Sequence, residues 1–247
     1  MDKKIRDNLA IINDNIAKAC DKSGRSIDDV TLIAVTKSVE VDSIRALLEL
    51  GHVHMGESRS PEIVKRNAVI NESISRRIEL PGINPNNRPI RPVWHMIGHL
   101  QRNKVKSLLP IVEYIHSVDS LRLAEEINTT AAKLGLEEKV KILLQVNTSQ
   151  EKQKYGLAVG AVAALAEQII TLPNLQVSGL MTMAPNTLDS DRCRFCFSRL
   201  REIFEDMKTD RIVGPEFKHL SMGMSQDYVE AIEEGGTMVR IGSALFA

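Results

Sequence analysis

The chain has 247 residues, 43% of them apolar, and its 32 basic residues balance its 32 acidic residues. This length suits one large domain or two small ones, and it is close to the usual size of a (β/α)8 barrel. The balanced charge excludes a strong overall attraction to nucleic acid or to a membrane surface, and favours a small neutral or anionic ligand held by local chemistry.

The amino-terminal segment, Met1 to Lys22, is rich in Asp, Lys and Asn and has no unbroken apolar stretch. It predicts a helix, and it has neither the apolar core of a signal peptide nor the length of a membrane span. We therefore expect a cytoplasmic protein that does not associate with membranes.

After this helix the chain alternates between short β-branched apolar runs and amphipathic segments. The predicted strands are Val30–Thr36, His52–Gly56, Val93–Gly98, Tyr114–Val118, Val140–Val146, Gln176–Met183, His219–Met222 and Thr237–Ile241. The predicted helices are Lys3–Lys22, Asp42–Leu50, Ser120–Leu134, Ala158–Thr171, Asp191–Met207 and Gln226–Glu234. Eight such strands separated by helices predict a parallel sheet closed into a single (β/α)8 barrel domain over residues 1–247. A doubly wound open sheet is the structural rival, but the glycine-rich first turn typical of that fold is absent.

Local signals refine the boundaries of these elements. Asp42, Ser120 and Asp191 each stand before a periodic run and are predicted helix caps. The stretch Ser75–Pro92 contains four prolines, so it is predicted to be an extended surface loop.

Lys37 directly follows the first predicted strand. In a parallel barrel, functional groups gather at the carboxyl ends of the strands. One interpretation is a lysine that simply points into solvent. The functional interpretation is a partly desolvated amine with a lowered pKa that forms a Schiff base with an aldehyde.

The last two predicted strands end in glycine and serine. Gly223 and Ser225 follow the seventh strand, while Gly242 and Ser243 follow the eighth. Exposed backbone amides and hydroxyls at these two loops suit a phosphate dianion, although Gly-Ser turns are also common without a ligand. A lysine opposite a phosphate site is what a phosphorylated aldehyde requires.

Arg240 falls within an apolar strand, where a buried guanidinium needs partners. Its structural role would be a salt bridge inside the barrel. Its functional role would be to donate a hydrogen bond to a ring nitrogen, which keeps a pyridine unprotonated and makes it a weaker electron sink.

Histidine and cysteine pairs raise the question of a metal. His95 and His99 have the spacing of a helical metal pair, but they flank a predicted strand end without a completing carboxylate or cysteine, and His52 and His54 are interpreted as structural. Cys193 and Cys196 form a CxxC spacing within a predicted helix and are interpreted as core residues. We therefore predict that the protein binds no metal.

Several ordered motifs together resemble the pyridoxal phosphate homeostasis proteins, whose fold looks like the barrel domain of alanine racemase standing alone. The resemblance runs from Leu32 to Phe246 and rests on Ala34–Lys37, Gly56–Arg59, Trp94–Lys104, His116–Ser120, Gly179–Ala184, Leu220–Ser225 and Val239–Gly242. It implies that pyridoxal 5′-phosphate (PLP) forms a Schiff base with Lys37, that Ser225, Gly242 and Ser243 lie at its phosphate, and that Arg240 faces the pyridine nitrogen. Met224 is expected to be a further cofactor-binding residue. Ser58 is placed at the ring, at a position where the family commonly has asparagine.

The resemblance also implies a function. Such proteins buffer or deliver vitamin B6, affect amino-acid and keto-acid balance, and have no well-defined catalytic turnover. PLP-dependent apoenzymes are the expected recipients, and the protein is expected to be a monomer or a weak dimer.

Two enzymatic alternatives stay open. A PLP-dependent amino-acid racemase would need a second base opposite Lys37, and no motif places Tyr114, Tyr155 or Tyr228 in that role. A barrel enzyme acting on a phosphorylated sugar without a cofactor would use Lys37 to form a Schiff base with its substrate.

Overall fold

In the computed structural model of the chain, which describes residues 2–78, 90–149, 151, 153, 155–187 and 189–247, parallel strands close into a barrel. They pair in chain order, and the last strand pairs with the first. The strands are β1 (Thr31–Val35), β2 (His54–Glu57), β3 (Val93–Met96), β4 (Val112–Val118), β5 (Val140–Gln145), β6 (Leu175–Met181), β7 (His219–Met224) and β8 (Met238–Ile241). The predicted eight-stranded parallel barrel is confirmed.

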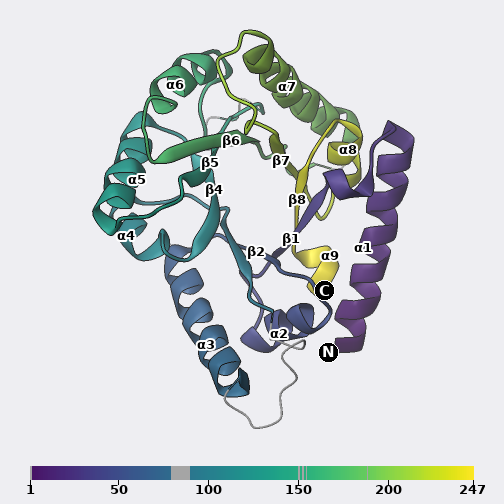
Figure 1. The fold of residues 1–247 in the computed structure, drawn as a ribbon. Helices are drawn as coiled ribbons and strands as arrows, with labels where there is room; N and C mark the ends of the chain where they lie inside the picture. Colours follow the sequence, from purple (N-terminus) through teal and green to yellow (C-terminus); the bar gives the residue numbers. More distant parts are fainter. Residues whose placement is uncertain (1, 79–89, 150, 152, 154, 188) are drawn as a thin grey trace.

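Helices form a ring around the barrel (Figure 1). They are α1 (Asp2–Ser23), α2 (Val41–Glu49), α3 (Ser60–Ile78), α4 (Val105–Leu108), α5 (Leu121–Leu134), α6 (Val162–Ile169), α7 (Ser190–Thr209), α8 (Tyr228–Glu233) and α9 (Ser243–Phe246). Short 3₁₀ helices lie at Ile27–Asp29, Arg102–Lys104 and Val159–Ala161. Within the described ranges, no helix combines the length and apolar character that a membrane crossing requires.

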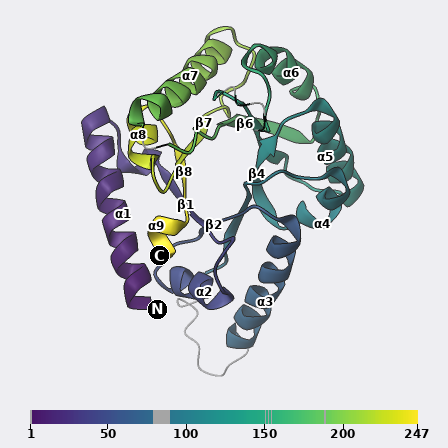
Figure 2. The same ribbon diagram turned by 180° about the vertical axis from the view of Figure 1, so that it is seen from behind.

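The additional amino-terminal helix completes the outer ring. The segment after β8 forms only the four-residue helix α9, and α1 contacts α8, α9 and α2 (Figures 1 and 2). One stripe of α1 is buried at helical spacing, and it consists of Ile5, Ile12, Ile16, Ala19 and Cys20. The side-chain amide of Asn8 donates to the carbonyl of Leu245 over 3.0 Å. Helix α1 therefore occupies the place that a full helix after β8 would take.

Two of the three predicted helix caps are wrong, and the third makes no capping hydrogen bond. Helix α2 begins at Val41 after Glu40, so Asp42 is not its cap but lies in the first turn and pairs with Arg45 at 2.8 Å. Ser120 does precede α5, but its side chain makes no capping hydrogen bond.

At α7 the capping residue is Asp189 rather than Asp191. The Asp189 carboxylate accepts the backbone N–H groups of Asp191 at 3.1 Å and Arg192 at 3.2 Å, so the cap lies two residues before the predicted one. The prediction of a loop over Ser75–Pro92 is wrong at its start, since α3 continues to Ile78. Residues 79–89 of that predicted loop lie outside the described residues.

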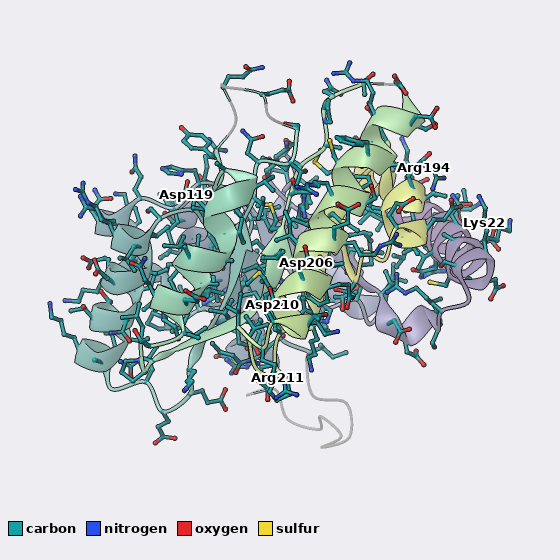
Figure 3. The ribbon with its side chains drawn as sticks, turned by 90° about the horizontal axis from the view of Figure 1, so that it is seen from above. Lys22, Asp119, Arg194, Asp206, Asp210 and Arg211 are labelled. Carbon is teal, nitrogen blue, oxygen red and sulfur yellow. The ribbon has the colours of Figure 1, made fainter. Side chains whose placement is uncertain are left out.

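The barrel interior is only partly apolar. Ile33, Leu143, Met181 and Met238 form a small apolar cluster separate from the large core between sheet and helices. Figure 3 shows the barrel from the side, with Asp119, which follows β4, toward one end and Asp210 and Arg211, which follow α7, toward the other. The end marked by Asp119 is the carboxyl end of the strands, where barrel proteins place their sites.

Candidate functional site

A cavity of about 560 Å³ lies at the carboxyl ends of β1, β7 and β8. This volume is within the range of small-molecule sites. Its lining includes each residue singled out from the sequence, which are Lys37, Ser58, Met224, Ser225, Arg240, Gly242 and Ser243. The structure therefore brings together residues that are up to 206 positions apart, from Lys37 to Ser243.

Lys37 stands at the cavity mouth, in the turn that follows β1. The residue is exposed, which agrees with the interpretation of a lysine that points into solvent and gives no support to the partly desolvated amine of the functional interpretation. The physical reason is its place in the turn beyond the strand, outside the packed interior. The expectation that Lys37 faces the turns after β7 and β8 is consistent with the shared cavity lining.

A buried ion pair holds the turn that carries Lys37. Arg66 on α3 lies 3.0 Å from the carboxylate of Glu57, which ends β2 and is fully buried. The same guanidinium donates to the carbonyls of Thr36 and, at 2.9 Å, of Val39. These bonds fix the backbone on both sides of Lys37.

Arg240 lies at the deep end of the cavity and is 4% exposed. Its guanidinium donates to the hydroxyl of Ser221 at 2.6 Å and to the carbonyl of Thr182 at 2.8 Å. Burial lowers the pKa of Arg240 to about 10, and the charge of Asp227 opposes this shift. Arg240 forms no ion pair with any described carboxylate, so the structural alternative, a salt bridge inside the barrel, is not found, and neutral groups hold this cation instead.

The turn after β7 is closed by hydrogen bonds to its own side chains. The backbone N–H of Met224 donates to the Asp227 carboxylate at 2.5 Å. The Ser225 hydroxyl oxygen accepts the backbone N–H groups of Gly242 and Ala244, each at 3.2 Å. Ser225 therefore holds two backbone N–H groups of the segment after β8 at one point on the cavity wall.

The remaining lining residues define the rim. Ser243 is exposed, and Met224 is 37% exposed. Ser58 is half-buried and its backbone N–H donates to the Glu57 carboxylate at 2.7 Å. Polar groups thus stand at the rim and at the deep end, with apolar wall between them from residues such as Ile97 and Met183.

The histidines and cysteines do not assemble a metal site in the described part of the chain. His95 is buried inside the barrel. His99 lies 3.6 Å from Asp119 and stacks on Tyr155, and it lines a second cavity of about 580 Å³. Cys193 and Cys196 are buried free cysteines on α7.

Sequence reasoning missed the residues that support the cavity. It gave no role to Glu57 and Arg66, which brace the Lys37 turn, or to Ser221, which holds Arg240. A signal was present for Glu57, because an acidic residue at the end of a buried strand requires a cation. Arg66 had no comparable signal, since its orientation depends on how α3 packs.

Comparisons with known proteins place this geometry in a family. The model of the alanine racemase N-terminal domain matches residues 8–247. A protein of Aquifex aeolicus named pyridoxal phosphate homeostasis protein is 36% identical over 238 residues, covering 96% of this chain and 95% of that protein.

Two solved structures are similar throughout. The structure of an unknown protein from Bifidobacterium adolescentis has a TM-score of 0.88 and 34% identity, covering 99% of this chain and 95% of that one. PipY of Synechococcus elongatus PCC7942, solved with PLP bound, has a TM-score of 0.79 and 30% identity, covering 98% of this chain and 100% of that one.

The fold and its carboxyl-end cavity thus define an alanine racemase-like barrel. Within that class, the chain belongs to the pyridoxal phosphate homeostasis protein family.

Proposed function

We propose that this chain binds PLP in the described cavity and serves vitamin B6 homeostasis, as one cytoplasmic domain of residues 1–247. The observation that carries the proposal is the meeting of an amine, a deep guanidinium and a serine-centred group of amides in one cavity. The PLP-bound structure of PipY supports the choice of ligand. Buffering of the cofactor, or its delivery to PLP-dependent apoenzymes, would then affect amino-acid and keto-acid balance.

The residues present match the three polar ends of the cofactor. The Lys37 amine at the mouth would condense with the aldehyde, so that a C=N bond would replace the C=O bond and water would leave. Ser225, Gly242 and Ser243 would hold the phosphate with hydroxyl and amide donors. Ser58 and Met224 would border the bound molecule from the rim.

Arg240 would face the ring nitrogen from the deep end. When bound, PLP supplies an aldehyde and an electron-withdrawing ring. A guanidinium donates a hydrogen bond without giving up its proton, so it leaves the ring nitrogen unprotonated and the ring a weaker electron sink. This electronic setting favours holding the cofactor over stabilising a carbanion.

The positions of the tyrosines favour a carrier over a racemase. None of the chain's three tyrosines, all of which lie in the described ranges, lines the cavity. Tyr228 is buried and accepts a hydrogen bond from Asn15 at 2.9 Å, and Tyr114 contacts His219 at 3.4 Å. Neither is placed as the second base that racemisation requires.

A titration tests the binding proposal. Purified protein is titrated with PLP and, separately, with pyridoxal, which lacks the phosphate, while visible absorbance is recorded. We expect a visible band with PLP and binding at least about tenfold weaker with pyridoxal, equivalent to about 1.4 kcal/mol. Ser225→Ala should reduce the difference in affinity between PLP and pyridoxal. Ser107→Ala, at an exposed serine outside the cavity, should leave that difference unchanged. Protein that stays colourless with PLP would contradict the proposal.

A second measurement separates carrier from racemase. Amino acids are incubated with the PLP-loaded protein in deuterated water, and exchange of the α-proton is followed by NMR. If the protein is a carrier, the α-proton should exchange at a rate close to the rate with free PLP. Rapid exchange that is lost in Lys37→Ala would establish the racemase function instead.

A further inference from the structure

A continuous chain of polar side chains crosses the barrel interior and ends at Arg240. His54 Nδ1 lies 3.0 Å from His95 Nε2, and His95 Nδ1 lies 3.0 Å from His116 Nε2. His116 Nδ1 lies 2.8 Å from Ser221 Oγ, which accepts from Arg240 at 2.6 Å. We call His54, His95, His116 and Ser221 the relay.

The relay connects the two ends of the barrel. His54 is the first residue of β2 and is half-buried, at the amino-terminal end of the strands. His95 and His116 are fully buried on β3 and β4. Arg240 lines the cavity at the opposite end.

Arg240 sets the direction of each hydrogen bond in the relay. A guanidinium is a donor only, so Ser221 Oγ accepts from it. The nitrogen of His116 is then the one remaining described partner for the Ser221 hydroxyl proton, so we assign Ser221 as the donor to His116 Nδ1. A neutral His116 then carries its proton on Nε2 and donates to His95 Nδ1. By the same step, His95 carries its proton on Nε2 and donates to His54 Nδ1.

The histidines have the neutral form that this pattern requires. Burial lowers the pKa of His95 to about 3, helped by the nearby charge of His54. Burial also lowers the pKa of His116 well below its usual value, with contributions from His95 and Arg240. A buried neutral imidazole has one donor nitrogen and one acceptor nitrogen, so a directed chain satisfies both.

We propose that the relay positions Arg240. Its hydrogen bonds are polarised toward the guanidinium and keep that group charged and oriented, although no described carboxylate contacts it. Its aligned hydrogen bonds turn their acceptor ends toward the cation, and such chains strengthen one another at low dielectric. Two of the guanidinium donors are held by Ser221 and Thr182, which leaves the other N–H groups for the cavity. Donation from these N–H groups to the ring nitrogen of a bound ligand rests on the proposed function, whereas the direction of the hydrogen bonds in the relay does not.

Nitrogen NMR of histidine-labelled protein without PLP tests the direction. We expect the Nε2–H tautomer at His54, His95 and His116 in the wild type at neutral pH. Ser221→Ala should remove that preference at His116, because it disconnects the ring from Arg240. A proton on Nδ1 of His116 in the wild type, or protonation of both nitrogens, would overturn the proposal.

A matched pair of substitutions tests the positioning effect. His116→Asn keeps an amide oxygen two bonds from Cβ that accepts from Ser221, whereas His116→Leu has a similar size and no acceptor. We expect PLP to bind about tenfold more weakly to the leucine variant, with a shifted absorption maximum, and within about threefold of wild type to the asparagine variant. His99→Leu, outside both relay and cavity, should leave the spectrum and affinity unchanged.

Equal behaviour of the asparagine and leucine variants would overturn the positioning role. If either variant fails to fold, the tautomers in the wild type still decide the direction of the relay. Failure of wild-type protein to bind PLP would refute the proposed function, and the NMR result would remain a separate test of the relay.

Discussion

Replacing Arg66 by alanine should weaken both the fold and the turn that carries Lys37. The Arg66 side chain is 11% exposed and its partner Glu57 is fully buried, so the substitution leaves a buried carboxylate without its cation. Breaking such a buried pair from one side costs about 3–5 kcal/mol. The carbonyls of Thr36 and Val39 lose their donors at the same time.

Urea unfolding followed by fluorescence of Trp94, the chain's one tryptophan, measures the change. With a urea dependence of about 3 kcal/mol per M, we expect the midpoint to fall by about 1 M or more. Arg76→Ala serves as a control, because Arg76 pairs with Glu72 at 2.6 Å on the exposed face of the same helix. That variant should lose less than about 1 kcal/mol.

The double variant Arg66→Leu with Glu57→Gln sharpens the test. Removing both charges eliminates the unpaired buried carboxylate, so this variant should be more stable than Arg66→Ala alone. A midpoint for Arg66→Ala equal to that of wild type, or a double variant less stable than the single one, would refute the role assigned to the pair.

Three further predictions concern pH and packing. His95 has a pKa of about 3 in the folded chain and about 6.5 when unfolded, so its contribution to stability is present above pH 6.5 and is lost as pH falls toward 3. The free energy of unfolding, measured with urea, should decrease on going from pH 7 to pH 5, by up to about 1.4 kcal/mol per pH unit for this residue, and a value that does not change with pH would contradict the burial of a neutral His95. Gly223→Ala should destabilise by about 1–3 kcal/mol or more, because φ is +90° there and a Cβ would lie 2.5 Å from that of Ala231; an unchanged melting temperature would show that alanine causes no strain at this end of β7. Ile12→Ala should cost about 2–5 kcal/mol if α1 closes the barrel wall, and a cost below about 1 kcal/mol, measured by denaturant unfolding, would show that α1 is peripheral.

The alternation of strands and helices could be predicted because it follows from local patterns. β-branched runs and the spacing between them are properties of neighbouring residues, so each of the eight strands was found to within about two residues. Helix boundaries were less certain, since α7 is capped by Asp189 and not by the predicted Asp191. The prolines after Ile78 led the predicted loop to begin too early.

The cavity lining was also predictable, because strand ends converge at one end of a barrel. The partners of the lining residues were not, since they depend on side-chain orientation between distant segments. Ser221 and His116 are 105 residues apart, and neither position shows that a hydrogen bond of 2.8 Å links them. The exposure of Lys37 likewise depends on the shape of its turn and not on its neighbours in the sequence.

Mapping the site of borohydride reduction tests the central claim most directly. Protein loaded with PLP is reduced, digested and analysed by mass spectrometry, alongside Lys37→Ala and the exposed-lysine control Lys65→Ala. The account predicts a pyridoxyl-phosphate group on Lys37 in wild type and in the control, and no reducible label in Lys37→Ala, which should still bind PLP more weakly through its phosphate contacts. A label on another lysine, or unchanged labelling in Lys37→Ala, would contradict it.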